Sequence, residues 1–217
     1  MATAAEQSGG LPWGRAVLSW ATRSPWPVYV AGLAPAALYF YWGAVNRLGA
    51  DPIRAFEHVL GLWALRFLIL TLLVTPLRHV TGFNLVRYRR ALGLLAFYYA
   101  AMHFLVYMAL DKAFDMKIVL EDIVKRPFIT IGMAALVFLL PLALTSSNYA
   151  IRRMGQGWTR MHRLVYPIAA LAATHFILSV KSWPVEPLVY AGIVAALLAF
   201  RPLRRFVPKA RPRPRRS

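Results

Sequence analysis

Six stretches of mostly apolar residues, each long enough to cross a lipid bilayer, constrain this chain more than any other feature. They lie at residues 27–45, 58–77, 91–110, 127–145, 162–180 and 185–200, with polar or charged segments between them. About 20 residues of α-helix cross a bilayer core of about 30 Å, and a helix satisfies its own backbone hydrogen bonds inside lipid. The pattern therefore predicts an all-α integral membrane bundle of about six transmembrane helices.

Composition supports this class and narrows the chemistry. The 217 residues are 59% hydrophobic, which is too apolar for a soluble domain of this size. The chain contains no cysteine, which excludes disulfides, iron–sulfur ligation and the attachment of c-type haem. Any metal ligands must therefore be histidines or carboxylates. We expect a cytoplasmic N-terminal segment at 1–26, a membrane domain at 27–201 and a basic, disordered cytoplasmic tail at 202–217.

The net charge of +18 is distributed unevenly along the chain. Most of the 26 Lys and Arg residues fall in the termini and in the segments at 78–90 and 146–163, whereas every acidic residue except Glu6 falls in the intervening loops. Because Lys and Arg accumulate on the cytoplasmic side of short loops, we expect both termini to be cytoplasmic. A basic face beside membrane spans favours anionic lipid over nucleic acid as its partner, so no nucleic-acid binding is expected.

Two histidines inside the predicted spans lie at the same depth. His103 is about 18 Å from Ala91, the start of the third span, and His175 is about 20 Å from His162, the start of the fifth. Two imidazoles at one depth on different helices are the arrangement that holds a haem iron from both faces. The leading hypothesis is bis-histidine b-type haem. The alternative is that each imidazole only bonds a neighbouring hydroxyl or carbonyl group.

The other histidines are less clearly placed. His162 lies about 140° around an ideal helix from His175, so an unbroken helix would not direct both to one side, although Pro167 between them can kink it. His58 and His79 fall at predicted helix ends, and we interpret them mainly as interfacial residues. Arg66 lies within the second span, where a guanidinium costs about 2.5 to 3.5 kcal/mol unless it is paired or reaches the headgroups. A haem propionate or a quinone carbonyl would serve as its partner.

Several segments resemble the ferric-reductase-like transmembrane domain, and within it the haem-binding membrane subunits of bacterial systems that repair methionine sulfoxide in proteins. The segments are "LGADP" at 48–52, "TPLR", "RRALGL", "MHFLVY", "WTRMHRLVY", "HFILSVK" and "PLVYAG". The resemblance implies a multi-pass protein of the bacterial inner membrane that binds b-type haem and FMN. It also implies that electrons pass from the quinone pool to a periplasmic molybdopterin-containing subunit, which reduces methionine sulfoxide in oxidised proteins.

The resemblance also implies roles for particular residues. The histidines of the family correspond to His103, His162 and His175. Broader ferric reductases have two histidines on each of two helices, and here Arg89 or Arg90 stands where the fourth is expected. A guanidinium cannot ligate iron, because it is always protonated and only donates hydrogen bonds. It can bind a flavin phosphate or a haem propionate, or act only as a positive anchor at the cytoplasmic side.

The sequence contains no substrate-reducing site. It has no dinucleotide-binding G-x-G-x-x-G motif, no nucleophile with a positioned base, and no soluble domain large enough for a flavin reductase. We therefore expect an electron-transfer subunit of an oxidoreductase complex. Two alternatives stay open here: a ferric-reductase-like cytochrome b with another acceptor, and a non-redox transporter whose histidines relay protons.

Overall fold

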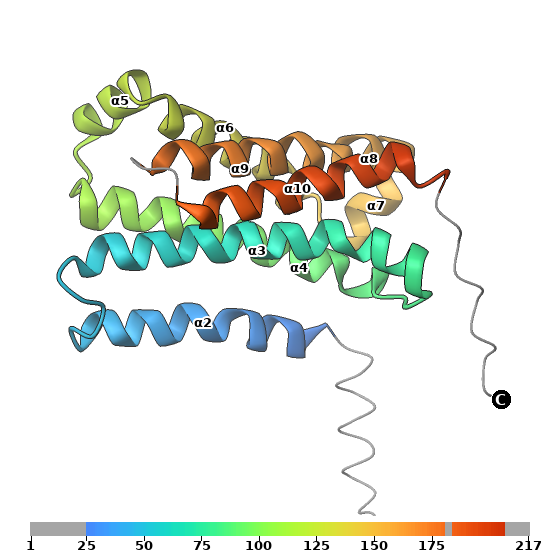
Figure 1. Ribbon diagram of the computed structural model, residues 1–217, viewed down its shortest axis with the longest axis horizontal. Coiled ribbons are helices and arrows are strands. Elements are labelled where there is room, and N and C mark those ends of the chain that lie inside the picture. Colours follow the sequence, from blue (N-terminus) through green and yellow to red (C-terminus); the bar gives the residue numbers. More distant parts are fainter. Residues whose placement is uncertain (1–24, 181–183, 207–217) are drawn as a thin grey trace, which may run out of the picture.

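A computed structural model describes residues 25–180 and 184–206. Most of the predicted segments 1–26 and 202–217 therefore lies outside the described residues. The described chain is helical, which confirms the all-α class. Six longer helices form the bundle (Figure 1): α2 (Trp26–Ala44), α3 (Pro52–Thr81), α4 (Arg89–Val106), α6 (Pro127–Leu144), α9 (Val165–Ser179) and α10 (Val185–Leu203).

Shorter helical segments connect these six. At one end of the bundle, the π-helical turn η2 (Tyr107–Asp111) extends α4 and is followed by α5 (Met116–Lys125) (Figure 1). The other short segments precede α4 or α9: η1 (Val86–Tyr88), α7 (Asn148–Met154), α8 (Gln156–Met161) and η3 (His162–Leu164). The long helices alternate in direction, so the basic segments at 78–90 and 146–163 meet at the end of the bundle opposite α5 (Figure 1).

Among the described residues, five helices are long and apolar enough to cross a membrane, one fewer than the six expected. They run over Pro52–Thr81, Val86–Asp111, Pro127–Leu144, Gln156–Ser179 and Val185–Leu203. The remaining long helix, α2, has 19 residues but is not among these five. That α2 also crosses the membrane stays a prediction.

Helix α2 nevertheless packs closely against the bundle. A methyl group at Gly32 would lie 2.4 Å from a Leu95 side-chain carbon, so a larger residue there would require the Leu95 side chain to move. The buried Tyr99 hydroxyl donates to the Gly32 carbonyl at 2.7 Å and accepts from the Ala36 amide at 3.0 Å. It thereby joins two backbone groups one turn apart in α2. These contacts fix α2 beside α3 and α4.

Helix α3 is much longer than the predicted stretch at 58–77. Its 30 residues begin after Asp51, whose side chain accepts from the Arg54 amide, and end at Gly82, which has a left-handed backbone (φ 76°). Such a helix is about 45 Å long and exceeds the bilayer core. Capping residues outside the apolar stretch thus decide where it begins and ends. The other five long helices begin and end within a few residues of the predicted positions.

Candidate functional site

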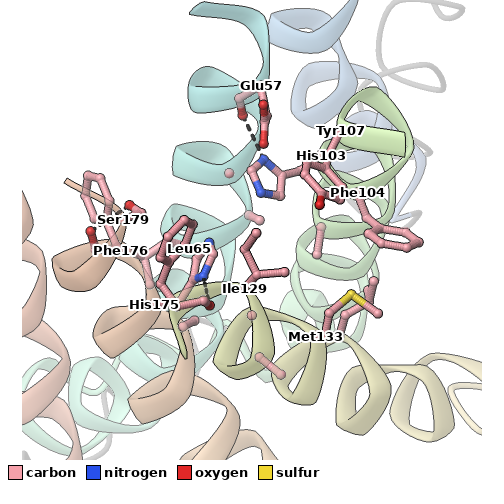
Figure 2. Close-up of a pocket in the computed structure, with 18 of the residues that line it drawn as sticks. Glu57, Leu65, His103, Phe104, Tyr107, Ile129, Met133, His175, Phe176 and Ser179 are labelled. Atoms are coloured by element: carbon pink, nitrogen blue, oxygen red, sulfur yellow. Dashed lines mark hydrogen bonds between the residues drawn. The ribbon is translucent and has the colours of Figure 1, made fainter. Parts of the chain in front are cut away.

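The structure brings the two depth-matched histidines together. His103 lies on α4 and His175 on α9, and the centres of their rings are 6.2 Å apart with the ring planes at 80°. Both rings line one cavity of about 870 Å³, called here the paired-histidine cavity (Figure 2). Its volume is in the range of about 300 to 1,000 Å³ that is usual for small-molecule and cofactor sites.

A backbone carbonyl orients each imidazole. His103 Nδ1 lies 2.9 Å from the Glu57 carbonyl oxygen on α3, and His175 Nδ1 lies 2.6 Å from the Phe128 carbonyl oxygen on α6 (Figure 2). A carbonyl oxygen only accepts, so each Nδ1 carries the ring hydrogen and donates it. Each Nε2 therefore keeps its lone pair. This is the usual arrangement of a histidine that ligates a metal.

A glycine lies beside each of these rings. A methyl group at Gly61 would be 3.1 Å from His103 Nδ1, and one at Gly132 would be 2.7 Å from His175 Nδ1. Each glycine follows by four residues the residue whose carbonyl accepts the hydrogen bond, so it stands one helical turn further along the same face. The absent side chain lets the imidazole reach the helix backbone. The α3–α4 and α6–α9 pairs thus hold their histidines in the same way.

The separation of the rings suits one metal atom between them. Imidazole nitrogens bind metal ions at about 2.0 to 2.1 Å, so two nitrogens on opposite sides of one metal atom lie about 4 Å apart. Each ring centre is about 1 Å behind its nitrogen, which places the ring centres about 6 Å apart. The observed 6.2 Å matches this spacing.

A second cavity lies around His162. It has a volume of about 530 Å³ and is lined by Arg87, Arg89, Arg90, Arg163 and Arg201. None of the described residues that line it is Asp or Glu. Such a concentration of guanidinium groups favours an anionic ligand. We call it the arginine-lined cavity.

His162 has a free ring nitrogen in this second cavity. Its Nδ1 lies 3.0 Å from the Trp158 carbonyl oxygen, and its ring stacks on Trp158 with the ring centres 3.8 Å apart. Its Nε2 is buried and has no hydrogen-bond partner among the described residues. His162 and His175 thus line different cavities. Leu68 and Leu139 line both cavities and so form part of the wall between them.

Comparison with known proteins identifies the family of this chain. The model of the ferric reductase like transmembrane component matches residues 60–173. The chain belongs to this family. The matched range contains His103 and His162 and ends two residues before His175.

Curated relatives match a larger part of the chain. Three of them, from Brucella ovis, Brucella suis and Brucella melitensis, are each 59% identical over 192 residues, which is 88% of this chain and 87% of the relative. Each is named "Protein-methionine-sulfoxide reductase heme-binding subunit MsrQ". No solved structure matches the chain.

Arg66 lies apart from both cavities. Its Nε donates to the Tyr190 hydroxyl of α10 at 2.7 Å, and its guanidinium carbon is 5.0 Å from the centre of the Trp63 ring. Neither cavity is lined by Arg66. The Arg66 guanidinium is therefore in contact with the Tyr190 hydroxyl and the Trp63 ring, whereas the sequence suggested an anionic partner for it.

His58, interpreted from the sequence as mainly interfacial, lines the paired-histidine cavity. Its ring lies 5.8 Å from that of Phe176, the neighbour of His175. The apolar stretch begins at His58, which suggested a helix end, but α3 starts six residues earlier. Asp51 caps α3 and Pro52 is its first residue, a pair that is typical of a helix start. This pair in the sequence would have placed His58 inside the helix.

Proposed function

We propose that this chain is the membrane electron-transfer subunit of an oxidoreductase and that it holds a b-type haem between His103 and His175. The observation that carries the proposal is the pair of imidazoles from α4 and α9, 6.2 Å apart at their centres, each with Nδ1 bonded to a carbonyl. The two free Nε2 atoms would be the ligands that the chain supplies to the haem iron. The names of the curated relatives support haem as the group.

Bound haem would supply a one-electron iron couple, and the chain would supply its orientation and surroundings. The carbonyls of Glu57 and Phe128 hold the two Nδ1 hydrogens and keep each Nε2 directed into the cavity. Leu65, Leu68 and Leu139 form apolar walls of the cavity, and charged residues also line it: Arg54, Glu57, Asp111, Lys112 and Arg126. The polarity of the surroundings and the histidine ligands are among the features that set the potential of a haem.

The arginine-lined cavity is proposed as the place where electrons enter. Arg89 and Arg90 would bind the phosphate of FMN or a propionate of a second haem, and the free His162 Nε2 would ligate iron or bond a flavin or quinone. The buried nitrogen without a partner and the five lining arginines support an anionic redox group there. Arg66 stays a candidate for contact with a quinone, since its Nε bond to Tyr190 uses only part of the guanidinium.

The names of the curated relatives support a proposal for the electron acceptor of this chain, and the electron donor is proposed with it. A protein-methionine-sulfoxide reductase has a catalytic subunit besides its haem-binding one, and we propose that this chain serves a periplasmic molybdopterin-containing subunit of that kind. The electron source would be the quinone pool of the bacterial inner membrane. The shared wall at Leu68 and Leu139 would leave only a short gap between redox groups in the two cavities.

The first experiment is a visible absorption spectrum of the purified protein. The wild type, expressed with ample haem, should show a reduced b-haem spectrum, and His103→Ala and His175→Ala should each abolish or strongly alter it. His79→Ala is the matched control, because His79 lines neither cavity, and it should keep the spectrum. A colourless wild-type protein would contradict haem binding and favour the transporter alternative.

The same variants test the acceptor. Membranes that contain the chain and a periplasmic molybdopterin methionine-sulfoxide reductase should transfer electrons from reduced quinone to methionine sulfoxide, and His175→Ala should stop this transfer. Equal transfer in membranes that lack the chain would contradict the proposed partner while leaving haem binding intact.

A further inference from the structure

Helix α5 lies between η2 and α6 at one end of the bundle (Figure 1). Lys112 and Arg126, which flank α5 along the chain, line the paired-histidine cavity. The ten residues of α5 present three different faces. Val119, Asp122 and Ile123 turn toward the bundle and are buried or half-buried. The other two faces are exposed, one apolar and one charged.

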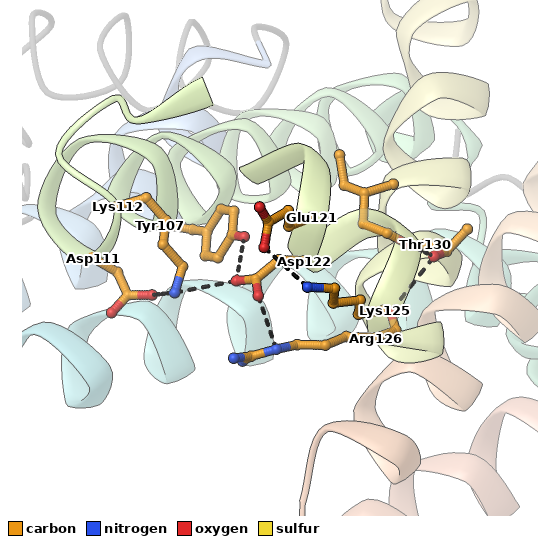
Figure 3. A network of polar contacts seen from close by, with 9 residues as sticks. Tyr107, Asp111, Lys112, Glu121, Asp122, Lys125, Arg126 and Thr130 are labelled. Atoms are coloured by element: carbon orange, nitrogen blue, oxygen red, sulfur yellow. Dashed lines mark hydrogen bonds and ion pairs between the residues drawn. The ribbon is translucent and has the colours of Figure 1, made fainter. Parts of the chain in front are cut away.

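The buried face fixes the rotation of α5 about its axis. The Asp122 carboxylate accepts a hydrogen bond from the Tyr107 hydroxyl at 3.0 Å and pairs with Lys112 at 3.1 Å and Arg126 at 2.9 Å (Figure 3). Asp122 is only 7% exposed. Because three partners hold the Asp122 carboxylate, α5 cannot rotate freely about its axis, and the directions of its two exposed faces relative to the bundle are fixed.

The apolar face is a stripe of three residues spaced by four: Met116, Leu120 and Val124, which are 54%, 60% and 85% exposed. Successive members of such a series turn by about 40°, so they follow one side of the helix. The charged face beside it carries Lys117, Glu121 and Lys125, again spaced by four. Around the helix the order is therefore bundle, apolar stripe, charged face. Ile118, 44% exposed, lies beyond the charged face.

The length of α6 sets the depth of this stripe in the membrane. Helix α6 has 18 residues and is about 27 Å long, which barely crosses a bilayer core of about 30 Å. Its first residue, Pro127, must lie near the boundary of the hydrocarbon. Since α5 ends at Lys125 and the extended Arg126 joins it to α6, Val124 is three residues from Pro127 and lies within about 10 Å of that boundary.

We propose that α5 is an interfacial helix that lies along the rim of the bundle and inserts Met116, Leu120 and Val124 among lipid acyl chains. The charged face then points to water and headgroups, as in other amphipathic helices at membrane surfaces. Phe114, 61% exposed, precedes the stripe and would enter the same layer. The inference depends on the membrane spans and not on the proposed redox function. It assigns lipid, and no partner protein, to this face.

The test uses spin labels on single cysteines, because the chain contains none of its own. Full-length protein is labelled at position 120 or 124, or at 117 or 121 as matched controls, and reconstituted in vesicles of phosphatidylethanolamine and phosphatidylglycerol. Labels on the stripe should collide several-fold more with oxygen than with a water-soluble nickel chelate, and labels on the charged face should show the reverse.

Two results would overturn the proposal. If labels at 120 and 124 are as accessible to the nickel chelate as those at 117 and 121, then the stripe faces water. If they are shielded from both reagents, protein covers the stripe, either a second copy or another chain. Thermal unfolding of each labelled protein in detergent, compared with the unlabelled wild type, checks that the cysteine has not disturbed the bundle.

Discussion

At the scale of single residues, hydrogen bonds to backbone carbonyl oxygens determine which ring nitrogen of His103 and His175 is free to bind a metal. Depth along the helices was enough to predict that His103 and His175 meet. It could not reveal that each Nδ1 donates to a carbonyl of a neighbouring helix, because those acceptors are 46 and 47 residues away along the chain. The partner of Arg66, Tyr190, is 124 residues away and was equally hidden. The position of a residue along its helix can be predicted from the sequence. Contacts between helices also depend on how each helix is rotated about its own axis, which the sequence pattern did not predict.

His162 is the residue whose replacement best separates the two cavities. His162→Ala should leave the spectrum of the His103/His175 haem in place, because His162 lines only the arginine-lined cavity. Reduction of that haem by quinol should slow by tenfold or more, whereas reduction by dithionite should stay normal. Stopped-flow absorbance with the two reductants measures this. Unchanged quinol reduction would mean that His162 only packs on Trp158, and loss of all haem would mean that it ligates the first iron.

At the scale of helices, two glycines set how closely the histidines approach. Gly132→Ala should displace the His175 ring, because the new methyl group would lie 2.7 Å from Nδ1 and break the bond to the Phe128 carbonyl. Gly61→Ala should act more weakly, at 3.1 Å from His103 Nδ1. Gly192→Ala is the control, with nothing within 4 Å of its methyl group. Haem content and midpoint potential should change most in Gly132→Ala and not in Gly192→Ala; equal changes would contradict this role.

The short helix α5 lies outside every apolar stretch of about 20 residues, so the hydropathy pattern did not predict it. Its ten residues mix charged and apolar side chains, and its buried face depends on Asp122, whose partners Tyr107 and Lys112 belong to the preceding segment. Although burial tends to raise the pKa of Asp122, the hydrogen bonds from Lys112 and Tyr107 outweigh it and lower that pKa below its usual value. The ionised carboxylate is therefore the form that stabilises this end of the bundle.

Asp122→Asn should destabilise the protein by about 3 kcal/mol or more at neutral pH, because it leaves Lys112 and Arg126 without their shared carboxylate. A carboxylate with a lowered pKa stabilises the fold fully above its unfolded-state pKa. The difference from wild type should therefore shrink as the pH falls below about 4 and be lost once the pH is below the lowered pKa of the folded state. Glu121→Gln is the control: its exposed pair with Lys125 is worth at most about 1 kcal/mol. Thermal unfolding in detergent measures both, and equal effects would contradict the burial argument.

At the scale of the whole molecule, the apolar pattern predicted the bundle, and the charge pattern predicted which loops share an end. The basic segments at 78–90 and 146–163 do lie together, opposite α5 (Figure 1). The two cavities were harder to predict. A single helix from 162 to 180 suggested a conflict between His162 and His175, but the short 3₁₀ segment His162–Leu164 precedes α9 and the two residues serve separate cavities. Local breaks of this kind depend on packing that periodicity does not record.

The sidedness of the bundle in the membrane is the remaining prediction of the charge pattern. Reporter fusions after Ala50 and after Phe114 should report the periplasm, and a fusion after Asn148 should report the cytoplasm, because the excess of Lys and Arg lies at the α7 end. An enzyme active only in the periplasm and a fluorescent protein active only in the cytoplasm give opposite signals at each site. The predicted orientation would place the paired-histidine cavity toward the periplasm, on the side of the proposed acceptor, and the arginine-lined cavity toward the cytoplasm. Reversed signals would place the acceptor on the wrong side and contradict the proposed direction of electron transfer.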